Sequence, residues 1–502
     1  LNGSAGVGGP GVWGGGARGE ECGVFGVWGD AGEGTGPARL AYFGLFSLQH
    51  RGQESAGIAV TDGVGIERRT GMGLVPQVFG PEDLAALDAV ASRRSDGGVG
   101  VGVGGAIGHN RYSTTGGSEA GNSQPFYGVY SGGPIAIAHN GNVTNASVIR
   151  RELQSAGHAF HATSDTEVML QTIAAEGAEA GCDDPLASAL GRFEGAFSVV
   201  LLHSDRVEAA RDPWGWRPLC VGRMPSGAWV VSSETIALDV IGAAFVRDVE
   251  PGEIVTLNDD GLGSRRFAEA ASRRAHCVFE HVYFASPASC VDGKTVQRVR
   301  ERLGERLAEE APAGAEVVMP MPDSGRSAAT GFARASGIPY REGIIPNRYV
   351  GRTFIKPTSV ERVDAVRLKL NVVSEVVKGH SVVVVDDSIV RGTTTRVKMD
   401  QLRSAGAREI HLRISCPPII SPCYFGVDFA DTDQLVAANH SVEEIRSMLG
   451  VDSLHYLSLD ALLDEAEGGT CDREHFCTAC YSGDYRIRIE PGLSKEILAQ
   501  NC

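Results

Sequence analysis

The stretch at 381–395, Ser-Val-Val-Val-Val-Asp-Asp-Ser-Ile-Val-Arg-Gly-Thr-Thr-Thr, constrains the fold more than any other part of the sequence. Its valines at 382–385 show no polar alternation, which is typical of a central parallel strand buried on both faces. Asp386 and Asp387 follow where that strand should end, and a helical segment begins after the threonines. Because ligands of open parallel sheets bind outside the carboxyl ends of the strands, this stretch predicts an α/β domain with a binding site at this edge.

The residues after the strand predict a seat for a phosphate group. A glycine lets the backbone approach a ligand closely, and a helix N-terminus presents N–H groups and a partial positive charge. Gly392 and the threonines that follow it supply both features, and the two acids beside them could hold ribose hydroxyls or a magnesium ion. The structural alternative is a solvated acid pair followed by a capped helix. No Gly-Lys-Thr follows, so the stretch is not a Walker loop.

The complete string resembles the phosphoribosyl pyrophosphate (PRPP) motif of the type I phosphoribosyltransferases. The resemblance implies that PRPP binds to Asp386, Asp387, Arg391, Gly392, Thr393, Thr394 and Thr395. It also implies that Mg²⁺ is bound near the two acids.

Length, charge and cysteine content limit the class of protein. A chain of 502 residues is too long for one hydrophobic core, so two or more domains are expected. A net charge of −16 repels nucleic acid and anionic membranes, and no apolar run is long enough to span a bilayer. We therefore expect that the protein binds neither nucleic acid nor membranes. We also expect a cytoplasmic location. The eleven cysteines indicate metal binding or catalysis rather than a disulfide scaffold, because no signal peptide is evident.

Residues 1–21 contain nine glycines and predict a flexible leader. Cys22 then opens a strand-like run, Cys-Gly-Val-Phe-Gly-Val. A cysteine at the head of a buried strand is usually a small core side chain. If the leader is cleaved before Cys22, however, one residue carries both a thiol and a free α-amine, and the amine can act as the base for the thiol. The run resembles the mature start of the class II glutamine amidotransferases, which are N-terminal-nucleophile hydrolases.

Polar islands downstream of Cys22 fit the chemistry of a glutamine site. Such a site needs a cation for the α-carboxylate, an anion for the α-ammonium and donors for the oxyanion. Arg111 can supply the cation, Asp165 the anion, and Asn140 with the Gly141 N–H the oxyanion donors. Taken separately, Arg111 could form a surface ion pair and Asp165 could be a helix N-cap. Asn140 and Gly141 could form a hairpin turn.

In this order, the islands resemble the glutaminase domain of the class II amidotransferases. The resemblance implies catalytic roles for Cys22, Asn140 and Gly141, and glutamine-binding roles for Arg111, Asp165, Arg51 and Gly52. It also implies two stacked antiparallel sheets between layers of helices.

The pattern changes in the second half of the chain. A strand at 316–319 runs into the loop that contains Ser324. Resemblance to the phosphoribosyltransferases implies that Ser324 approaches the metal, whereas a helix N-cap is the alternative. Residues 347–354 resemble the lid that closes over PRPP in these enzymes and include Arg352. Lys369 follows and could meet pyrophosphate or lie on a solvated strand edge.

The motif Cys477-Thr-Ala-Cys480 is compatible with zinc, a redox pair or chance when it is taken alone. Four thiolates would suit zinc or a [4Fe–4S] cluster, and composition does not choose between them. Resemblance to the iron–sulfur amidophosphoribosyltransferases implies a [4Fe–4S] cluster on Cys277, Cys423, Cys477 and Cys480. Cys471 is a rival ligand that spacing alone does not exclude.

Taken together, the motifs resemble those of amidophosphoribosyltransferases that carry a propeptide and an iron–sulfur cluster. The resemblance implies that ammonia released from glutamine displaces pyrophosphate from PRPP and gives 5-phosphoribosylamine, the first step of purine synthesis. It also implies a homotetramer inhibited by purine nucleotides. The alternative is a PRPP-binding regulatory protein with an inactive glutaminase half, and the presence of Cys22, Arg111, Asn140 and Asp165 argues against it.

The expected fold is an α+β N-terminal-nucleophile hydrolase domain (αββα sandwich) followed by an α/β type I phosphoribosyltransferase domain with a doubly wound parallel sheet. The expected ranges are a propeptide at 1–21, a glutamine amidotransferase domain at 22–262, a phosphoribosyltransferase domain with the cluster cysteines at 263–485, and a tail at 486–502.

Overall fold

The computed structural model describes residues 21–30, 32, 35–92, 104–112, 117–347, 370–429, 431–469, 471–489 and 498. The chain divides into two compact units. The first unit contains the described residues within 301–420 and 431–462. The second contains those within 19–300, 421–430 and 463–502. None of the described helices has both the length and the apolar character needed to cross a membrane.

The second unit is built on two antiparallel sheets. One sheet has the strand order β11-β9-β10-β1-β4-β2-β3. Its strands are β1 (Gly23–Gly29), β2 (Ser55–Thr61), β3 (Ile66–Met72), β4 (Gly104–Arg111), β9 (Cys220–Arg223), β10 (Trp229–Ser232) and β11 (Ala244–Asp248). The other sheet has the order β13-β12-β8-β7-β6-β5. Its strands are β5 (Phe126–Tyr130), β6 (Gly133–Val143), β7 (Gly195–Leu202), β8 (Val207–Arg211), β12 (Glu253–Asn258) and β13 (Gly261–Arg266).

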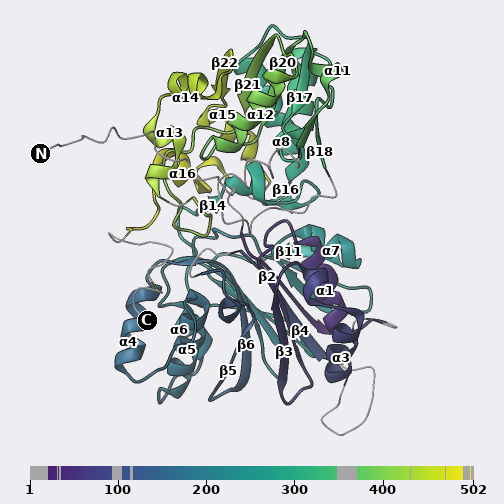
Figure 1. Ribbon diagram of the computed structural model, residues 1–502. Helices are drawn as coiled ribbons and strands as arrows, with labels where there is room; N and C mark the ends of the chain where they lie inside the picture. The colour runs from purple at the N-terminus through teal and green to yellow at the C-terminus, as the bar shows by residue number, and fades with distance from the viewer. Residues whose placement is uncertain are drawn as a thin grey trace, which may run out of the picture. The chain divides into compact units, whose positions relative to one another are not determined.

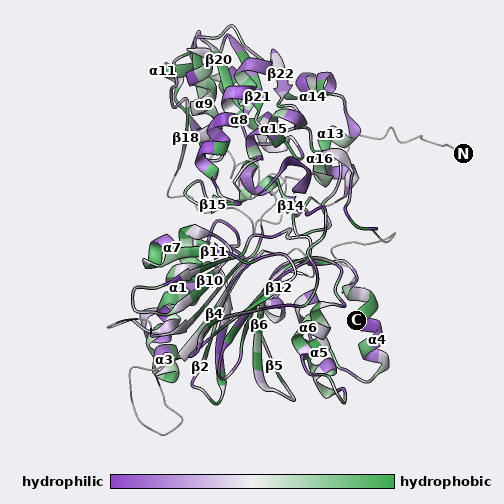
Figure 2. Ribbon diagram, turned by 180° about the vertical axis from the view of Figure 1, so that it is seen from behind, coloured by the Kyte–Doolittle hydropathy of each residue, from purple (hydrophilic) through white to green (hydrophobic). Residues whose placement is uncertain are grey.

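Helices cover the outer face of each sheet (Figure 1). On the β1 sheet they are α1 (Pro37–Ser47), α2 (Val75–Val78), α3 (Pro81–Ala91) and α7 (Thr235–Ile241). On the β6 sheet they are α4 (Ala146–Ser155), α5 (Asp165–Ala178) and α6 (Pro185–Leu190). Between the sheets, Val24 and Ile107 of one pack with Val200 and Val255 of the other. Figure 2 shows apolar and polar residues mixed along these elements, as expected when each element has one buried face.

These layers confirm the predicted αββα sandwich. The boundary predicted after residue 262 falls inside β13, which pairs with β12 along its whole length. Short elements complete this unit, and they carry several of the predicted cysteines. They are β14 (His276–Cys277), η2 (Glu280–Phe284), β15 (Cys290–Val291), β16 (Lys294–Thr295), η4 (Arg473–His475), β23 (Phe476–Cys477) and α16 (Ala479–Ser482).

The first unit contains a parallel sheet with the strand order β17-β20-β21-β22. Its strands are β17 (Val317–Pro320), β20 (Ser381–Asp386), β21 (Glu409–Ile414) and β22 (Ser453–Tyr456). Helices pack against them, including α9 (Arg326–Ser336), α12 (Thr393–Ser404) and α14 (Val442–Leu449). The valines at 382–385 of β20 are completely buried, as the predicted central strand requires. The predicted parallel α/β domain is therefore confirmed.

Candidate functional site

Cys22 precedes β1 directly and is 4% exposed. Its Sγ donates to the Tyr112 carbonyl oxygen at 3.4 Å, and the Tyr112 N–H lies 3.5 Å from the same sulfur. Burial raises the pKa of the thiol to about 11, although the Tyr112 bond and the charge of Arg111 act in the opposite direction. With the Glu21–Cys22 peptide bond intact, the thiol is therefore almost entirely protonated near neutral pH.

Arg111 directly precedes Tyr112, whose backbone contacts the thiol. The charge of Arg111 lowers the pKa of Cys22, and the charge of Asp165 raises it. Arg111 ends β4, is 2% exposed and lies 3.6 Å from the Glu54 carboxylate. Asp165 begins α5 and is 3% exposed. Burial raises the pKa of Asp165, but His139 and bonds from backbone N–H groups outweigh that effect and lower it.

The alternative roles of Arg111 as a surface ion pair and of Asp165 as a helix N-cap are wrong. Arg111 is buried rather than part of a surface ion pair. Ser164 is the N-cap of α5, whereas the Asp165 carboxylate accepts the Val143 N–H at 3.1 Å.

Asn140 and Gly141 lie inside β6 instead of in a hairpin turn. The Asn140 side chain is 1% exposed, and its Nδ2 has no hydrogen-bond partner among the residues that the structure describes. A buried amide N–H without a partner is costly, unless a ligand supplies the acceptor. This amide is therefore suited to bind a negatively charged oxygen.

Arg51 is fully enclosed, and its guanidinium donates to the carbonyl oxygen of Cys22 at 3.0 Å. The same guanidinium forms ion pairs with Glu21 at 2.8 Å, Glu234 at 2.6 Å and Glu280 at 2.7 Å. Burial lowers the pKa of Arg51, but Glu280 and Glu234 raise it above its ordinary value. The Arg51 side chain therefore holds the backbone of the predicted nucleophile.

Gly52, which was also predicted to bind glutamine, lies against the backbone of Asn110 and Arg111. A Cβ atom at position 52 would lie 2.7 Å from the Asn110 carbonyl oxygen.

Sequence reasoning missed Arg217, a second enclosed arginine in this network. It pairs with the Glu21 carboxylate, and its Nε donates to the Phe425 carbonyl oxygen at 3.0 Å. The neighbouring Trp216 ring stacks on Phe425 with ring centroids 4.4 Å apart. The sequence feature that could have identified Arg217 is the position of an arginine inside the apolar run that follows the turn at 211–215.

The segment at 423–429, which begins with the predicted cluster ligand Cys423, packs against the Cys22 site. The Asn142 side-chain amide donates to the Tyr424 carbonyl oxygen at 2.8 Å. A Cβ atom at Gly426 would lie 3.2 Å from the Cα of Gly141. Further along the segment, Asp428 accepts a hydrogen bond of 3.0 Å from the Tyr112 hydroxyl. The segment therefore contacts the neighbours of both Cys22 and Asn140.

The predicted cluster cysteines come from neighbouring segments of this unit. β14 and β23 pair in parallel, with Cys277 opposite Cys477. The charges of Cys423 and Cys477 affect the pKa of Cys277, which burial raises to about 12. The carbonyl oxygen of Cys480 accepts the Ser421 N–H at 3.1 Å, which places α16 beside the segment that carries Cys423. Cys471 lies elsewhere, within reach of His276 and Asp292.

In the first unit, the predicted PRPP residues follow the carboxyl ends of adjacent parallel strands. Ser324 comes after β17 and donates to a carboxylate oxygen of Asp387. Asp386 ends β20, and its carboxylate accepts the Asp387 N–H at 2.9 Å. The Ser388 hydroxyl donates to the other oxygen of Asp387 at 2.7 Å. The structure thus brings Ser324 into contact with Asp387, which directly follows Asp386.

The predicted phosphate loop leads into α12. Gly392 is its N-cap and has φ of 74°, a left-handed conformation that favours glycine. Thr393, Thr394 and Thr395 form the first turn of α12, which begins earlier than the helical segment predicted from residue 396. Arg391 precedes the cap and is partly exposed. The predicted residues Arg352 and Lys369 lie outside the described part of the chain.

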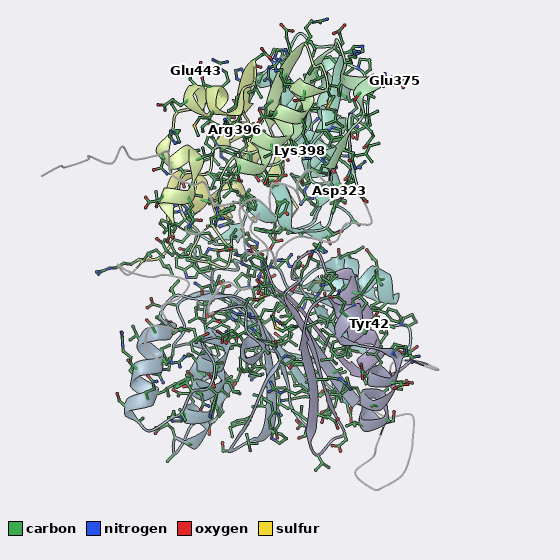
Figure 3. All side chains as sticks on the ribbon, viewed as in Figure 1. Tyr42, Asp323, Glu375, Arg396, Lys398 and Glu443 are labelled. Atoms are coloured by element: carbon green, nitrogen blue, oxygen red, sulfur yellow. The ribbon has the colours of Figure 1, made fainter. Side chains whose placement is uncertain are left out.

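Lys398 of α12 is a buried residue that the sequence did not single out (Figure 3). Its Nζ donates to the Leu370 carbonyl oxygen at 2.9 Å and to the Gln401 side chain at 2.6 Å. Burial lowers the pKa of Lys398 to about 8. Lys398 therefore fixes the start of β19 (Leu370–Val372) against the helix that follows the phosphate loop.

An αββα unit of this kind and a parallel α/β unit define a class of enzyme. The class joins an N-terminal-nucleophile glutaminase fold to a phosphoribosyltransferase fold. Comparisons with known proteins support this assignment. Residues 109–240 match the family model described as "Glutamine amidotransferase domain".

Curated relatives match over nearly the whole chain. The amidophosphoribosyltransferase of Methanothermobacter thermautotrophicus is 47% identical over 486 residues, which are 96% of this chain and 98% of the relative. That of Bacillus subtilis is 43% identical, over 94% of this chain and 95% of the relative. A solved structure of the B. subtilis glutamine PRPP amidotransferase, complexed with ADP and GMP, has a TM-score of 0.85 at 42% identity. It covers 95% of this chain and 100% of that chain.

The chain belongs to the amidophosphoribosyltransferase family. The predicted enzyme class, a glutamine amidotransferase that is also a pentosyltransferase, is confirmed, as is the predicted function in purine synthesis. The alternative of a regulatory protein with an inactive glutaminase half is not favoured, because the full-length relatives are named as the enzyme.

Proposed function

We propose that Cys22 attacks the side-chain amide of glutamine and that the released ammonia aminates PRPP at the site in the other unit. The products are glutamate, pyrophosphate and 5-phosphoribosylamine. The observation that carries this assignment of residues is the composition of the Cys22 site. A buried thiol lies there with one buried cation, one buried anion and a buried amide donor without a partner among the described residues.

Arg111 binds the α-carboxylate of glutamine, and Asp165 binds its α-ammonium. Both side chains are buried, so an oppositely charged group of the ligand is favourable at each of them. A substrate that carries both charges satisfies the two sites together, which selects a free amino acid over a peptide-bound glutamine.

Cleavage of the Glu21–Cys22 bond activates the nucleophile. With the bond intact, the thiol has a pKa of about 11. Cleavage would give Cys22 a free α-amine, whose ordinary pKa is about 7.7–8.0. The amine accepts the thiol proton as sulfur attacks the amide carbon, and it returns that proton to the departing ammonia. Water then hydrolyses the thioester and releases glutamate.

Asn140 and the Gly141 N–H stabilise the oxyanion formed during this attack. A buried donor of this kind is already oriented, so little reorganisation is needed when charge develops on the oxygen. Loss of one such donor typically lowers kcat by about 10²–10³.

Asp386 and Asp387, with Ser324, offer the oxygen ligands that Mg²⁺ prefers, so these residues fit the ion that the family implies. When bound, Mg²⁺ would neutralise charge on the departing pyrophosphate. The residues of this chain do the remaining work: the acids orient the ribose, and Gly392 with the first turn of α12 binds the 5-phosphate.

Cys277, Cys423, Cys477 and Cys480 fit a [4Fe–4S] cluster of structural character. Support comes from the Cys277–Cys477 register and from the contact of α16 with the segment that carries Cys423. An iron–sulfur cluster takes thiolate ligands of this number. Its role would be to fix the 423–429 segment, which contacts the Cys22 site.

Purine nucleotides regulate the enzyme, by analogy with the B. subtilis structure complexed with ADP and GMP. We also propose a leader that is removed before Cys22, a homotetrameric assembly and a cytoplasmic location.

The test compares rates driven by glutamine and by ammonia, in protein whose N-terminus at Cys22 is verified by mass spectrometry. Cys22→Ala is expected to abolish phosphoribosylamine formation from glutamine and to preserve formation from ammonium chloride at high pH. Cys220→Ala, a buried cysteine away from the site, is the matched control and should keep both rates. Loss of both rates in Cys22→Ala alone would refute the assigned division of labour.

A further inference from the structure

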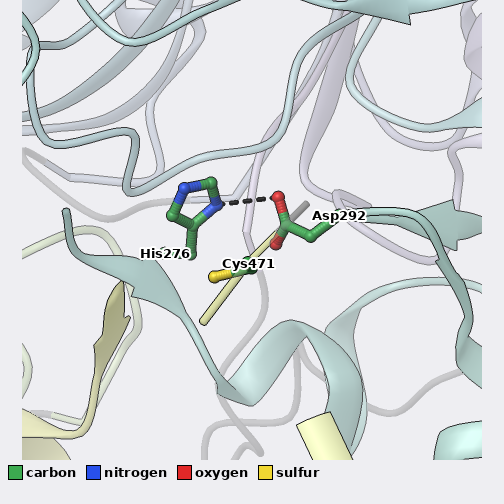
Figure 4. Close-up of side chains that lie close together, drawn as sticks. All are labelled: His276, Asp292 and Cys471. Atoms are coloured by element: carbon green, nitrogen blue, oxygen red, sulfur yellow. Dashed lines mark ion pairs between the residues drawn. The ribbon is translucent and has the colours of Figure 1, made fainter. Parts of the chain in front are cut away.

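A second group of potential metal ligands lies in the same unit as the four predicted cluster cysteines. His276, Asp292 and Cys471 each offer one ligand atom, and these atoms lie within 4.8 Å of one another. All of these side chains are buried. A ring nitrogen of His276 lies 2.7 Å from an Asp292 carboxylate oxygen, and the Cys471 sulfur lies beside them (Figure 4).

This group is separate from the predicted cluster site. Successive residues of a strand point to opposite faces, so His276 and Cys277 of β14 face in opposite directions. Cys277 is paired with Cys477, whereas His276 is paired with Phe476. The spacing of Cys471 and Cys477 left both as candidate cluster ligands, but only Cys471 lies within reach of His276 and Asp292 among the described residues.

The two ring nitrogens of His276 have different surroundings. Its Nδ1 faces Asp292, and Arg211 approaches the same nitrogen at 3.3 Å. Its Nε2 is buried and has no partner among the described residues. Nδ1 is therefore the nitrogen that would bind an ion shared with Asp292.

The set of donor atoms fits one kind of ion. Nitrogen, carboxylate oxygen and thiolate sulfur together suit Zn²⁺, whereas Mg²⁺ and Ca²⁺ prefer oxygen ligands alone. The Asp292 carboxylate and a Cys471 thiolate would together balance a divalent charge. Ligands of tetrahedral zinc lie roughly 3.4 Å apart, so the His276 and Asp292 atoms would need to separate by only roughly 0.7 Å.

We propose that His276, Asp292 and Cys471 bind a single Zn²⁺ ion, with one coordination position left for water. The ion joins β14, the turn after β15 and the residues before η4. It is a structural site distinct from the glutaminase and PRPP sites, so the proposal does not depend on the roles assigned to those sites.

The test measures zinc and iron in the full-length protein after equilibration with zinc and removal of loosely bound metal by dialysis. The wild type is expected to retain about one zinc per chain, and both Cys471→Ser and Asp292→Asn should bind it at least ten times more weakly. Asn is chosen at 292 because the residue has φ of 50°, which Asn tolerates. Cys290→Ser, an exposed cysteine on β15, is the matched control and should behave as the wild type. Unchanged iron content shows that each variant folds around the cluster.

X-ray absorption at the zinc edge identifies the ligands without interference from iron. The expected shell has one sulfur at about 2.3 Å and nitrogen and oxygen at about 2.0–2.2 Å. A shell of four sulfurs would place zinc in the site of the four cysteines and overturn the proposal. Absence of retained zinc, or equal retention by Cys471→Ser and the wild type, would also overturn it.

Discussion

At the scale of single residues, Arg51 shows how the site around Cys22 is held. Its guanidinium faces the carboxylates of Glu21, Glu234 and Glu280, and Arg217 pairs with Glu21 from another direction. Buried charges are stable only when each is paired and hydrogen-bonded. The arginines therefore compensate the charges of these carboxylates, and Arg51, through the Cys22 carbonyl, fixes the backbone of the proposed nucleophile.

Arg51→Met is expected to lower the free energy of unfolding by about 3–5 kcal/mol, because it leaves buried carboxylates without their cation. Denaturant titration, followed by a probe in the unit that contains Arg51, measures the effect. Adding Glu280→Gln should recover part of the loss, since fewer unpaired charges remain. Arg192→Met removes the ion pairs of a 36% exposed arginine with Glu152 and Glu176, and it should cost less than about 1 kcal/mol. Equal losses in Arg51→Met and Arg192→Met would contradict the role given to Arg51.

The residues proposed for the site could be selected from the sequence one by one, whereas their partners could not. A thiol, an arginine, an asparagine and an aspartate, in this order, indicated a glutamine site because each has a specific electrostatic task. The pairing of Arg217 with Glu21 joins positions 196 residues apart, and that of Asp428 with Tyr112 joins positions 316 residues apart. Such pairs leave no local pattern, because strand and helix periodicities report only on near neighbours.

At the scale of elements, β20 and α12 were predictable because a run of β-branched residues and a glycine cap act locally. The short strands β14 and β23 could not be predicted, because each has only two residues and shows no periodicity. The same is true of the 423–429 segment, which has no regular structure. Its position depends on Arg217, which binds the Phe425 carbonyl, and on the Cys423 thiol, which accepts the Phe425 N–H at 3.4 Å.

Gly426→Ala tests whether this segment positions the glutaminase site. Gly426 has φ of 113°, and an added Cβ would lie 3.2 Å from both the Gly141 backbone and the Arg217 guanidinium. Because displacements of about 1 Å can cost about 10²-fold in rate, we expect the glutamine-driven rate to fall about 10–100-fold and the ammonia-driven rate to persist.

The control for this prediction is Gly227→Ala. Gly227 has a similar φ of 102°, but a Cβ there would meet nothing within 4 Å. Gly227→Ala should therefore lower the free energy of unfolding only through the strain of alanine at positive φ, and it should keep the glutamine-driven rate. If Gly426→Ala behaves like Gly227→Ala, the segment does not position the site.

At the scale of the whole molecule, the residues proposed for each of the two reactions lie within one compact unit. Among the described residues, those around Cys22 belong to the second unit, and Ser324, Asp386 and Asp387 belong to the first. The hydrogen bonds described within each site likewise remain inside its unit. Glutamine hydrolysis and PRPP amination should therefore be separable by substitutions in either unit.

Asp387→Asn provides the test in the PRPP unit. The substitution removes one negative charge beside Ser324 and Asp386, so binding of Mg²⁺ and ribose should weaken. We expect phosphoribosylamine formation to fall at least a hundredfold with either nitrogen source. Glutamine hydrolysis measured without PRPP should stay within twofold of wild type. Chelation of Mg²⁺ should reproduce this pattern in the unmodified enzyme.

Asp323→Asn is the matched control, because the Asp323 side chain is 74% exposed and pairs only with Arg326 among the described residues (Figure 3). It should keep both activities, since an exposed pair contributes little to a buried site. A parallel fall of both activities in Asp387→Asn would mean that the PRPP unit is needed for the glutaminase reaction itself. In that case, the nitrogen-releasing site could not be assigned to residues of the second unit alone.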